Sequence, residues 1–318
     1  MADSLGQLLE MLADGHELAT PEYAAFSDLS RADAALVKEH WPAIAVETRA
    51  LLMERAGELA DVNLEYNFEA LGSLALDDPH PEVRERAVTA LWESEDRDIA
   101  RRLARLATED EGAGVRAAAA LALRGYVESI VGGRFDDETA RAISDALRKA
   151  VEDPNVDVRA AAVEAAGGLP EEWVASHILD AYEDDARELR IAAIRAMGDS
   201  AEERWAEYIA DQLYAGEPEL RLEAVLAAGA NGSESLVEPL GEALADEDPE
   251  IVLAVIEALG EIGGEDAVDL LKEFAPHAPE GFEDALEEAL SLANESSMFR
   301  RFGELDDSDN EDSDEDDE

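Results

Sequence analysis

The chain has 318 residues, and its 79 acidic side chains outnumber the 25 basic ones, giving a formal net charge of −54. This balance argues against nucleic-acid binding, which needs clustered Lys and Arg to neutralise phosphates, and against anionic membrane surfaces. The chain has no cysteine, which excludes disulfides and thiol chemistry. Ala and Leu dominate the apolar residues and aromatic residues make up only 5%, a composition that favours closely packed helices.

The N-terminal segment 1–63 predicts an irregular helical cap that contains one degenerate repeat. Leucines at 5–12 form a short amphipathic stretch, which either covers the end of a repeat array or binds a partner helix; we favour the cap. Ser30 is a candidate N-cap for a helix that reaches about His40, where a Trp-Pro pair stops it. A further helical pattern runs over 46–59.

An apolar residue followed by arginine recurs along the rest of the chain. From Val158 onward the apolar position returns at a constant interval, and the one longer step, from Val115 to Val158, contains an insertion near 126–137. These apolar anchors are Val83, Val115, Val158, Leu189, Leu220, Ile251 and Phe282, with arginine replaced after the last two. A repeat of this period predicts stacked structural units.

Other positions keep the same register. The residue seven after each anchor is always alanine, and glycine stands nine after four of them, at Gly167, Gly198, Gly229 and Gly260. Positions 0, 4, 7 and 8 after the anchor share one helix face, so an invariably small residue there predicts close approach to another helix. The glycines predict the end of that helix.

An aspartate precedes most anchors by five residues and, together with nearby prolines, predicts a turn and the start of a helix. The aspartates are Asp78, Asp110, Asp153, Asp184 and Asp246, whereas Ala215 and His277 interrupt the column. The segments before these turns also have helical periodicity. Each repeat is therefore expected to be a helical hairpin that buries its apolar face only by stacking on its neighbours.

The segments 153–162 and 256–268 resemble HEAT repeats, of the short kind called phycobilisome-lyase-like. The resemblance covers about 64–292 and implies an all-α fold, a right-handed α-solenoid (superhelix) of about seven hairpins over 64–295. It also implies that turn aspartates bond to helix arginines of neighbouring units. That pairing should reach Asp184 and Arg190 and weaken toward the C-terminus, where the columns break.

In HEAT-like solenoids the second helices line a concave face that commonly binds partners. On these helices the positions two and six after the anchor point away from the core. Apolar residues stand there at Leu121, Ile191, Leu222, Leu226 and Leu253. Exposed contiguous apolar surface suggests a binding site, while neighbouring helices could equally bury these side chains.

Residues 296–318 predict a disordered acidic tail, because the segment 304–318 is mostly acidic and contains no basic residue. Ahead of this block stand Phe299, Arg300, Arg301 and Phe302. These four residues are either a linear motif for a partner or a last half-turn that covers the final helices, and we favour the half-turn.

The sequence offers no catalytic constellation. Its five histidines lie in different repeats without metal-ligand spacing, no phosphate-binding glycine motif occurs, and each of the four tryptophans is expected to pack in the core. We therefore expect no cofactor, no metal and no enzyme activity, but a cytoplasmic protein-binding scaffold, and the acidity favours a basic partner. The alternative implied by the resemblance is an accessory enzyme or chromophore-binding protein of the bilin-lyase type. The acidity could also reflect a saline cytoplasm, which is compatible with a scaffold.

Overall fold

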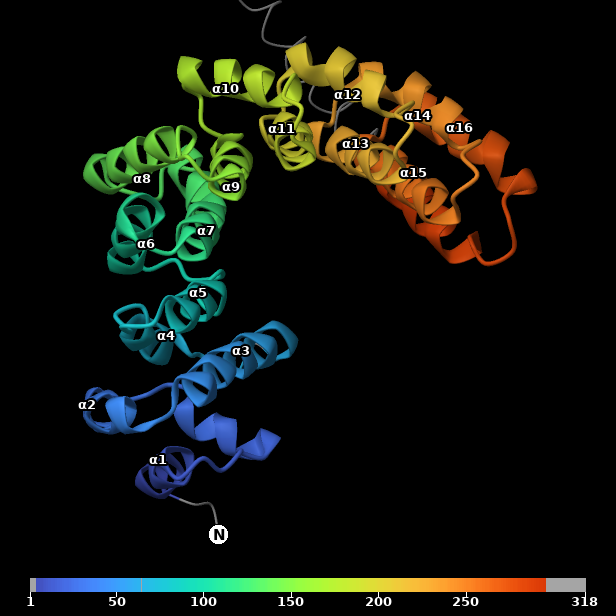
Figure 1. Ribbon diagram of the computed structural model, residues 1–318. Helices are drawn as coiled ribbons and strands as arrows, with labels where there is room; N and C mark the ends of the chain where they lie inside the picture. The colour runs from blue at the N-terminus through green and yellow to red at the C-terminus, as the bar shows by residue number, and fades with distance from the viewer. Residues whose placement is uncertain (1–3, 64, 296–318) are drawn as a thin grey trace, which may run out of the picture. The chain divides into compact units, whose positions relative to one another are not determined.

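The computed structural model describes residues 4–63 and 65–295 and is helical throughout, with no strand in these ranges (Figure 1). The chain forms two compact units, Met1–His177 (unit 1) and Ile178–Glu318 (unit 2), and the boundary falls within helix α10. The predicted motif at Phe299, Arg300, Arg301 and Phe302 lies outside the described residues, as does the acidic tail.

The helices follow the predicted segments closely. Those of unit 1 are α1 (Leu5–Ala13), η1 (Thr20–Phe26), α2 (Arg31–His40), η2 (Trp41–Ala43), α3 (Val46–Val62), α4 (Glu69–Ala75), α5 (Pro81–Thr89), α6 (Arg97–Glu109), α7 (Ala113–Val131), α8 (Asp137–Ala150) and α9 (Val156–Ala166), followed by α10 (Glu172–Tyr182) at the boundary. Those of unit 2 are α11 (Arg187–Asp199), η3 (Glu203–Trp205), α12 (Ala206–Gln212), α13 (Pro218–Asn231), η4 (Glu234–Leu236), α14 (Val237–Ala243), α15 (Pro249–Ile262), α16 (Glu265–Phe274), η5 (Ala275–His277) and a last helix over 283–295.

From α4 onward the described helices pair into seven successive hairpins, as the repeat predicted. Within each unit the helices form two layers (Figure 1). In unit 1 the second helices α5, α7 and α9 pack in order behind α3, while α6 and α8 pack in the other layer. In unit 2 the second helices α11, α13 and α15 pack in the same way. The fold is therefore an all-α solenoid.

The repeating glycines stand where the second helices end, and they also serve helix packing. Gly167 is the C-cap of α9, and α11, α13 and α15 end one or two residues after Gly198, Gly229 and Gly260. A Cβ atom added to Gly198 would stand 2.9 Å from the Cα of Ala227 on the next second helix. The invariant alanine of one repeat thus faces the glycine of the previous one, which confirms the predicted close approach.

The insertion in the long repeat is mostly helix. The segment from Tyr126 to Val131 lengthens α7 to 19 residues, and only the short stretch before α8 forms a loop. The Tyr126 side chain is buried, and its ring centroid lies 5.9 Å from that of Phe135 in the loop. The inserted residues therefore pack on the repeat that carries them.

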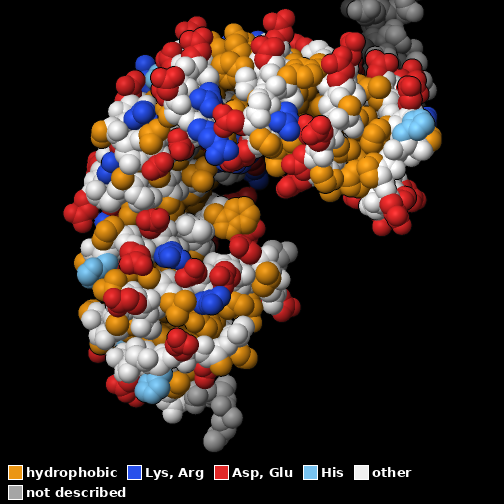
Figure 2. All heavy atoms as spheres, turned by 45° about the vertical axis from the view of Figure 1, so that its right-hand side comes forward, with side chains coloured by type: hydrophobic (Ala, Val, Ile, Leu, Met, Phe, Trp, Pro, Cys, Tyr) orange, Lys and Arg blue, Asp and Glu red, His pale blue; other side chains and the backbone are white. Residues whose placement is uncertain are grey.

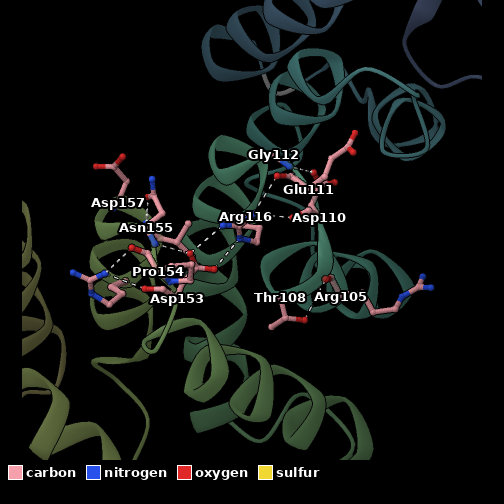
Figure 3. A network of polar contacts seen from close by, with 12 residues as sticks. Arg105, Thr108, Asp110, Glu111, Gly112, Arg116, Asp153, Pro154, Asn155 and Asp157 are labelled. Atoms are coloured by element: carbon pink, nitrogen blue, oxygen red, sulfur yellow. Dashed lines mark hydrogen bonds and ion pairs between the residues drawn. The ribbon is translucent and has the colours of Figure 1, made fainter.

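Arginines of the second helices bridge successive repeats (Figure 3). The Arg116 guanidinium donates to both carboxylate oxygens of Asp153 in the next repeat, at 2.8 and 3.0 Å, and to the backbone carbonyl of Asp110 in its own turn. Arg84 bonds to Asp110 in the same bidentate way. One guanidinium thus fixes two turns.

This series of arginine–aspartate pairs, the ladder, weakens at two of its later steps, as predicted, but the loss is not progressive, because an intact pair stands between them. Because Ala215 replaces the aspartate, the contact of Arg190 with the next repeat is a 3.4 Å one with Glu217, while its guanidinium still donates to the Asp185 carbonyl of its own turn at 3.1 Å. Beyond it Arg221 again binds both oxygens of Asp246, at 2.7 and 3.2 Å. The ladder is therefore weak at Arg190, intact at Arg221 and absent at Val252, where the arginine and the following aspartate are both replaced.

The N-terminal segment packs on the helices that follow it. The leucines at 8, 9 and 12 of α1 are buried, and α1 contacts α2. Ser30 caps α2 as predicted, with its hydroxyl oxygen accepting the backbone N–H of Asp33. These leucines are therefore engaged within the chain, as the capping role requires.

Candidate protein-binding face

The apolar residues predicted on the second helices of unit 2 lie on one face. Ile191, Leu222 and Leu253 occupy equivalent positions on α11, α13 and α15, which pack side by side, and each is half-buried. Leu226, one turn further along α13, is 50% exposed. We call these four residues the apolar strip. Figure 2 shows hydrophobic side chains gathered on this unit with acidic side chains among them.

Neighbouring helices bury the strip only in part. Full exposure of all the predicted residues is not observed, because adjacent second helices cover one side of each side chain. The strip still remains accessible on three successive helices, and Leu226 is its most exposed member. The structure thus answers the question of burial that the helical pattern left open.

Leu121, the remaining predicted residue, belongs to unit 1 and is 42% exposed on α7. It therefore does not belong to the apolar strip, whose four residues all lie in unit 2.

Trp92, just after α5, is 54% exposed and donates its indole N–H to Asp61 at 2.8 Å. The prediction that all tryptophans pack in the core is wrong for Trp92 and holds for Trp41 and Trp205, while Trp173 is half-buried.

Acidic side chains border the strip. Glu219 and Glu250 stand one residue before the anchors of α13 and α15, and Glu257 and Glu261 follow on α15; all four are exposed. The Glu261 side chain is exposed as a whole, but partial burial of its carboxyl group raises its pKa, and the negative charge of Glu257 raises it further. Close packing of like charges therefore already makes this border unfavourable for additional anions.

Ion pairs link α11 to α13 beside the strip, and one of them joins Arg187 to the border residue Glu219. Arg195 of α11 donates to both carboxylate oxygens of Glu223 on α13, at 2.8 and 2.5 Å. Arg195 occupies the position on its helix that Leu226 occupies on the next one. The pair fixes α11 against α13, and at this position α11 carries a charged side chain where α13 carries the exposed Leu226.

The described residues hold no group of three or more His, Asp or Glu side chains arranged to bind a metal ion. Likewise, no helix among them is both long enough and apolar enough to cross a membrane.

The model of the family described as HEAT repeats matches residues 68–143, 130–198, 144–214 and 206–291. The chain belongs to the HEAT-repeat family. The HEAT repeats therefore cover all seven hairpins, and the apolar strip lies on their second helices. No curated protein sequence matches the chain significantly.

Several solved structures are similar to this HEAT-repeat chain. The YibA protein of Escherichia coli shares 16% identity, with 92% of this chain and 98% of that one covered and a TM-score of 0.47. Human deoxyhypusine hydroxylase shares 19%, with coverages of 92% and 97% and a TM-score of 0.38. An engineered protein shares 16%, with coverages of 92% and 88% and a TM-score of 0.44. At such low similarity no function is transferred.

Proposed function

We propose that this HEAT-repeat chain is a non-catalytic scaffold that binds a protein partner on the apolar strip of unit 2. The observation that carries the proposal is an accessible leucine-rich row on three packed second helices, in a chain whose surface is otherwise strongly acidic. Contiguous exposed apolar surface rimmed by polar residues marks interaction sites. A face that only met water would carry charged residues at these positions.

The chemistry of the border indicates the kind of partner. Glu219 is already paired with Arg187, but the glutamates on α15 attract basic side chains, while the strip itself accepts apolar ones. A helix with an apolar stripe and basic flanks satisfies both requirements, because residues at helical spacing can lie along such a row. Long-range attraction from a net charge of −54 speeds the encounter and weakens as salt screens it.

The test is affinity capture from host lysate at two salt concentrations, followed by mass spectrometry. Leu226→Asp places a charge at the most exposed residue of the strip and should abolish capture of the partner without unfolding the chain. Tyr214→Asp is the matched control, because Tyr214 is 58% exposed in the same unit but follows α12, in the other layer. Circular dichroism checks that both variants are folded.

A partner that is lost with Leu226→Asp, kept with Tyr214→Asp and bound more weakly at high salt supports the scaffold function. If every captured protein is retained by the Leu226→Asp variant, the apolar strip is not the binding site.

A further inference from the structure

A pocket of about 690 Å³ lies in unit 1, outside the second-helix face. Its walls come from the C-terminal half of α2, from η2, from α4 and from the turn over 77–80, and Arg102 of α6 completes one side. Pockets that bind small molecules have volumes of about 300–1,000 Å³. The regular packing of the HEAT hairpins does not use this space.

The pocket reverses the charge balance of the chain. Acidic residues outnumber basic ones about threefold overall, yet Lys38, Arg49 and Arg102 line the pocket against only two carboxylates, Asp77 and Asp78. Lys38 is one of only three lysines in the sequence. It is exposed and has no ion-pair partner in the part of the chain that the structure describes. A cation is therefore available at the rim.

The carboxylates of the pocket are already engaged. Asp78 is fully buried and accepts hydrogen bonds from the Trp41 indole at 2.7 Å, from Arg49 and from the backbone N–H of His80 at 2.8 Å. Asp77 lies largely in solvent and pairs with Arg102 at 2.9 Å. These carboxylates consequently leave the charge of Lys38 uncompensated.

Arg49 adds an unused donor. Its side chain is only 6% exposed, yet just one of its terminal nitrogens reaches Asp78, and its Nε has no hydrogen-bond partner among the described residues. Buried donors are almost always paired, because an unpaired N–H loses its hydration without compensation. An unpaired guanidinium N–H in a pocket wall is typical of a site whose acceptor comes from a ligand.

Apart from Ser73 and His80, the remaining wall is apolar. Trp41 and Pro42 form one part of it, and Leu74, Ala34 and Ala70 form the rest. A pocket with an apolar wall on one side and a few convergent donors selects a ligand with an apolar body and one polar group.

We propose that this pocket binds a small organic anion, a carboxylate or phosphate attached to an apolar body the size of an aromatic ring. The negative group pairs with Lys38 at the rim, and the body packs on the Trp41 and Leu74 side. The pocket contacts no residue of the apolar strip, so this proposal stands or falls separately from the scaffold function.

Isothermal titration calorimetry with phenyl phosphate and benzoate tests the proposal, and benzyl alcohol and inorganic phosphate serve as comparison probes. We expect at least one aryl anion to bind more tightly than both comparison probes. Lys38→Glu should weaken that binding about tenfold or more, the worth of one charge-assisted contact. Lys149→Glu is the matched control, an exposed lysine in the last turn of α8, and should leave the affinity unchanged.

Preference for phenyl phosphate or for benzoate identifies the anionic group. Three outcomes overturn the proposal: no aryl anion binds up to about 10 mM, benzyl alcohol or inorganic phosphate binds as tightly as both aryl anions, or Lys38→Glu and Lys149→Glu have equal effects.

Discussion

The contact between Gly198 and Ala227 sets the spacing of α11 and α13, and Gly198→Ala tests this directly. The new Cβ would lie 2.9 Å from the Ala227 Cα and 3.0 Å from its carbonyl oxygen, whereas non-bonded carbon atoms prefer about 3.5–4.0 Å. Both contacts are with backbone atoms, which no side-chain rotation can relieve. The two helices must therefore separate.

The expected loss follows from two opposing effects. Overpacking of a close helix contact costs about 2–3 kcal/mol, and replacing glycine by alanine inside a helix returns about 1 kcal/mol. The free energy of unfolding should therefore fall by about 1–2 kcal/mol. For a unit of this size that corresponds to a decrease of about 3–6 °C in the melting temperature.

Thermal unfolding followed by circular dichroism measures this effect, with Gly125→Ala as the control. Gly125 lies inside α7, and an added Cβ would meet only the Trp92 carbonyl oxygen, at 3.8 Å. Gly125→Ala should therefore raise stability by about 0.5–1 kcal/mol. The double variant Gly198→Ala/Ala227→Gly should lose less than the two single effects added together. Equal stabilisation by Gly198→Ala and Gly125→Ala would refute the packing argument.

Further predictions concern the charged groups. Arg221→Met leaves the Asp246 carboxylate without its ion-pair partner and should lower the free energy of unfolding, measured with denaturant, by about 2–4 kcal/mol. Arg204→Met, which removes an exposed ion pair, should lower it less. Equal losses would show that the arginine–aspartate ladder does not stabilise the fold. Hydrogen bonds from Arg221 hold the pKa of Asp246 below its ordinary value, and at Asp153 burial acts to raise the pKa but the bonds from Arg116 outweigh it. Because these pKa values are lower in the folded state, the two carboxylates stabilise the fold fully above about pH 4, and this contribution is lost as the pH falls through the folded-state pKa. Asp246→Asn should therefore make the free energy of unfolding fall less steeply with decreasing pH in the acid range. The net charge of −54 predicts that the melting temperature rises with KCl concentration, because salt screens the repulsion between the acidic side chains. A melting temperature that does not change with salt would show that this repulsion destabilises the fold little.

The sequence alone determined the fold of this protein, because helical hairpins interact mainly with their neighbours. A local pattern that returns at a constant interval is then enough to specify each unit and its stacking. The anchors, the invariant alanines and the aspartate turns all took their predicted places, and the apolar strip could be located from two positions per repeat. The boundaries of most helices followed from the same periodicity.

Only the tertiary structure shows the features that depend on the distance between helices. The sequence marked Gly198 as small, but only the packed helices show that its neighbour is the Ala227 backbone. The ladder resumes at Arg221 because its guanidinium reaches forward to Asp246 in the next repeat, so the break at Ala215 affects only the preceding step. The pocket beside Lys38 has no linear signal at all, since its walls come from α2, α3, α4 and α6 and only folding brings their side chains together.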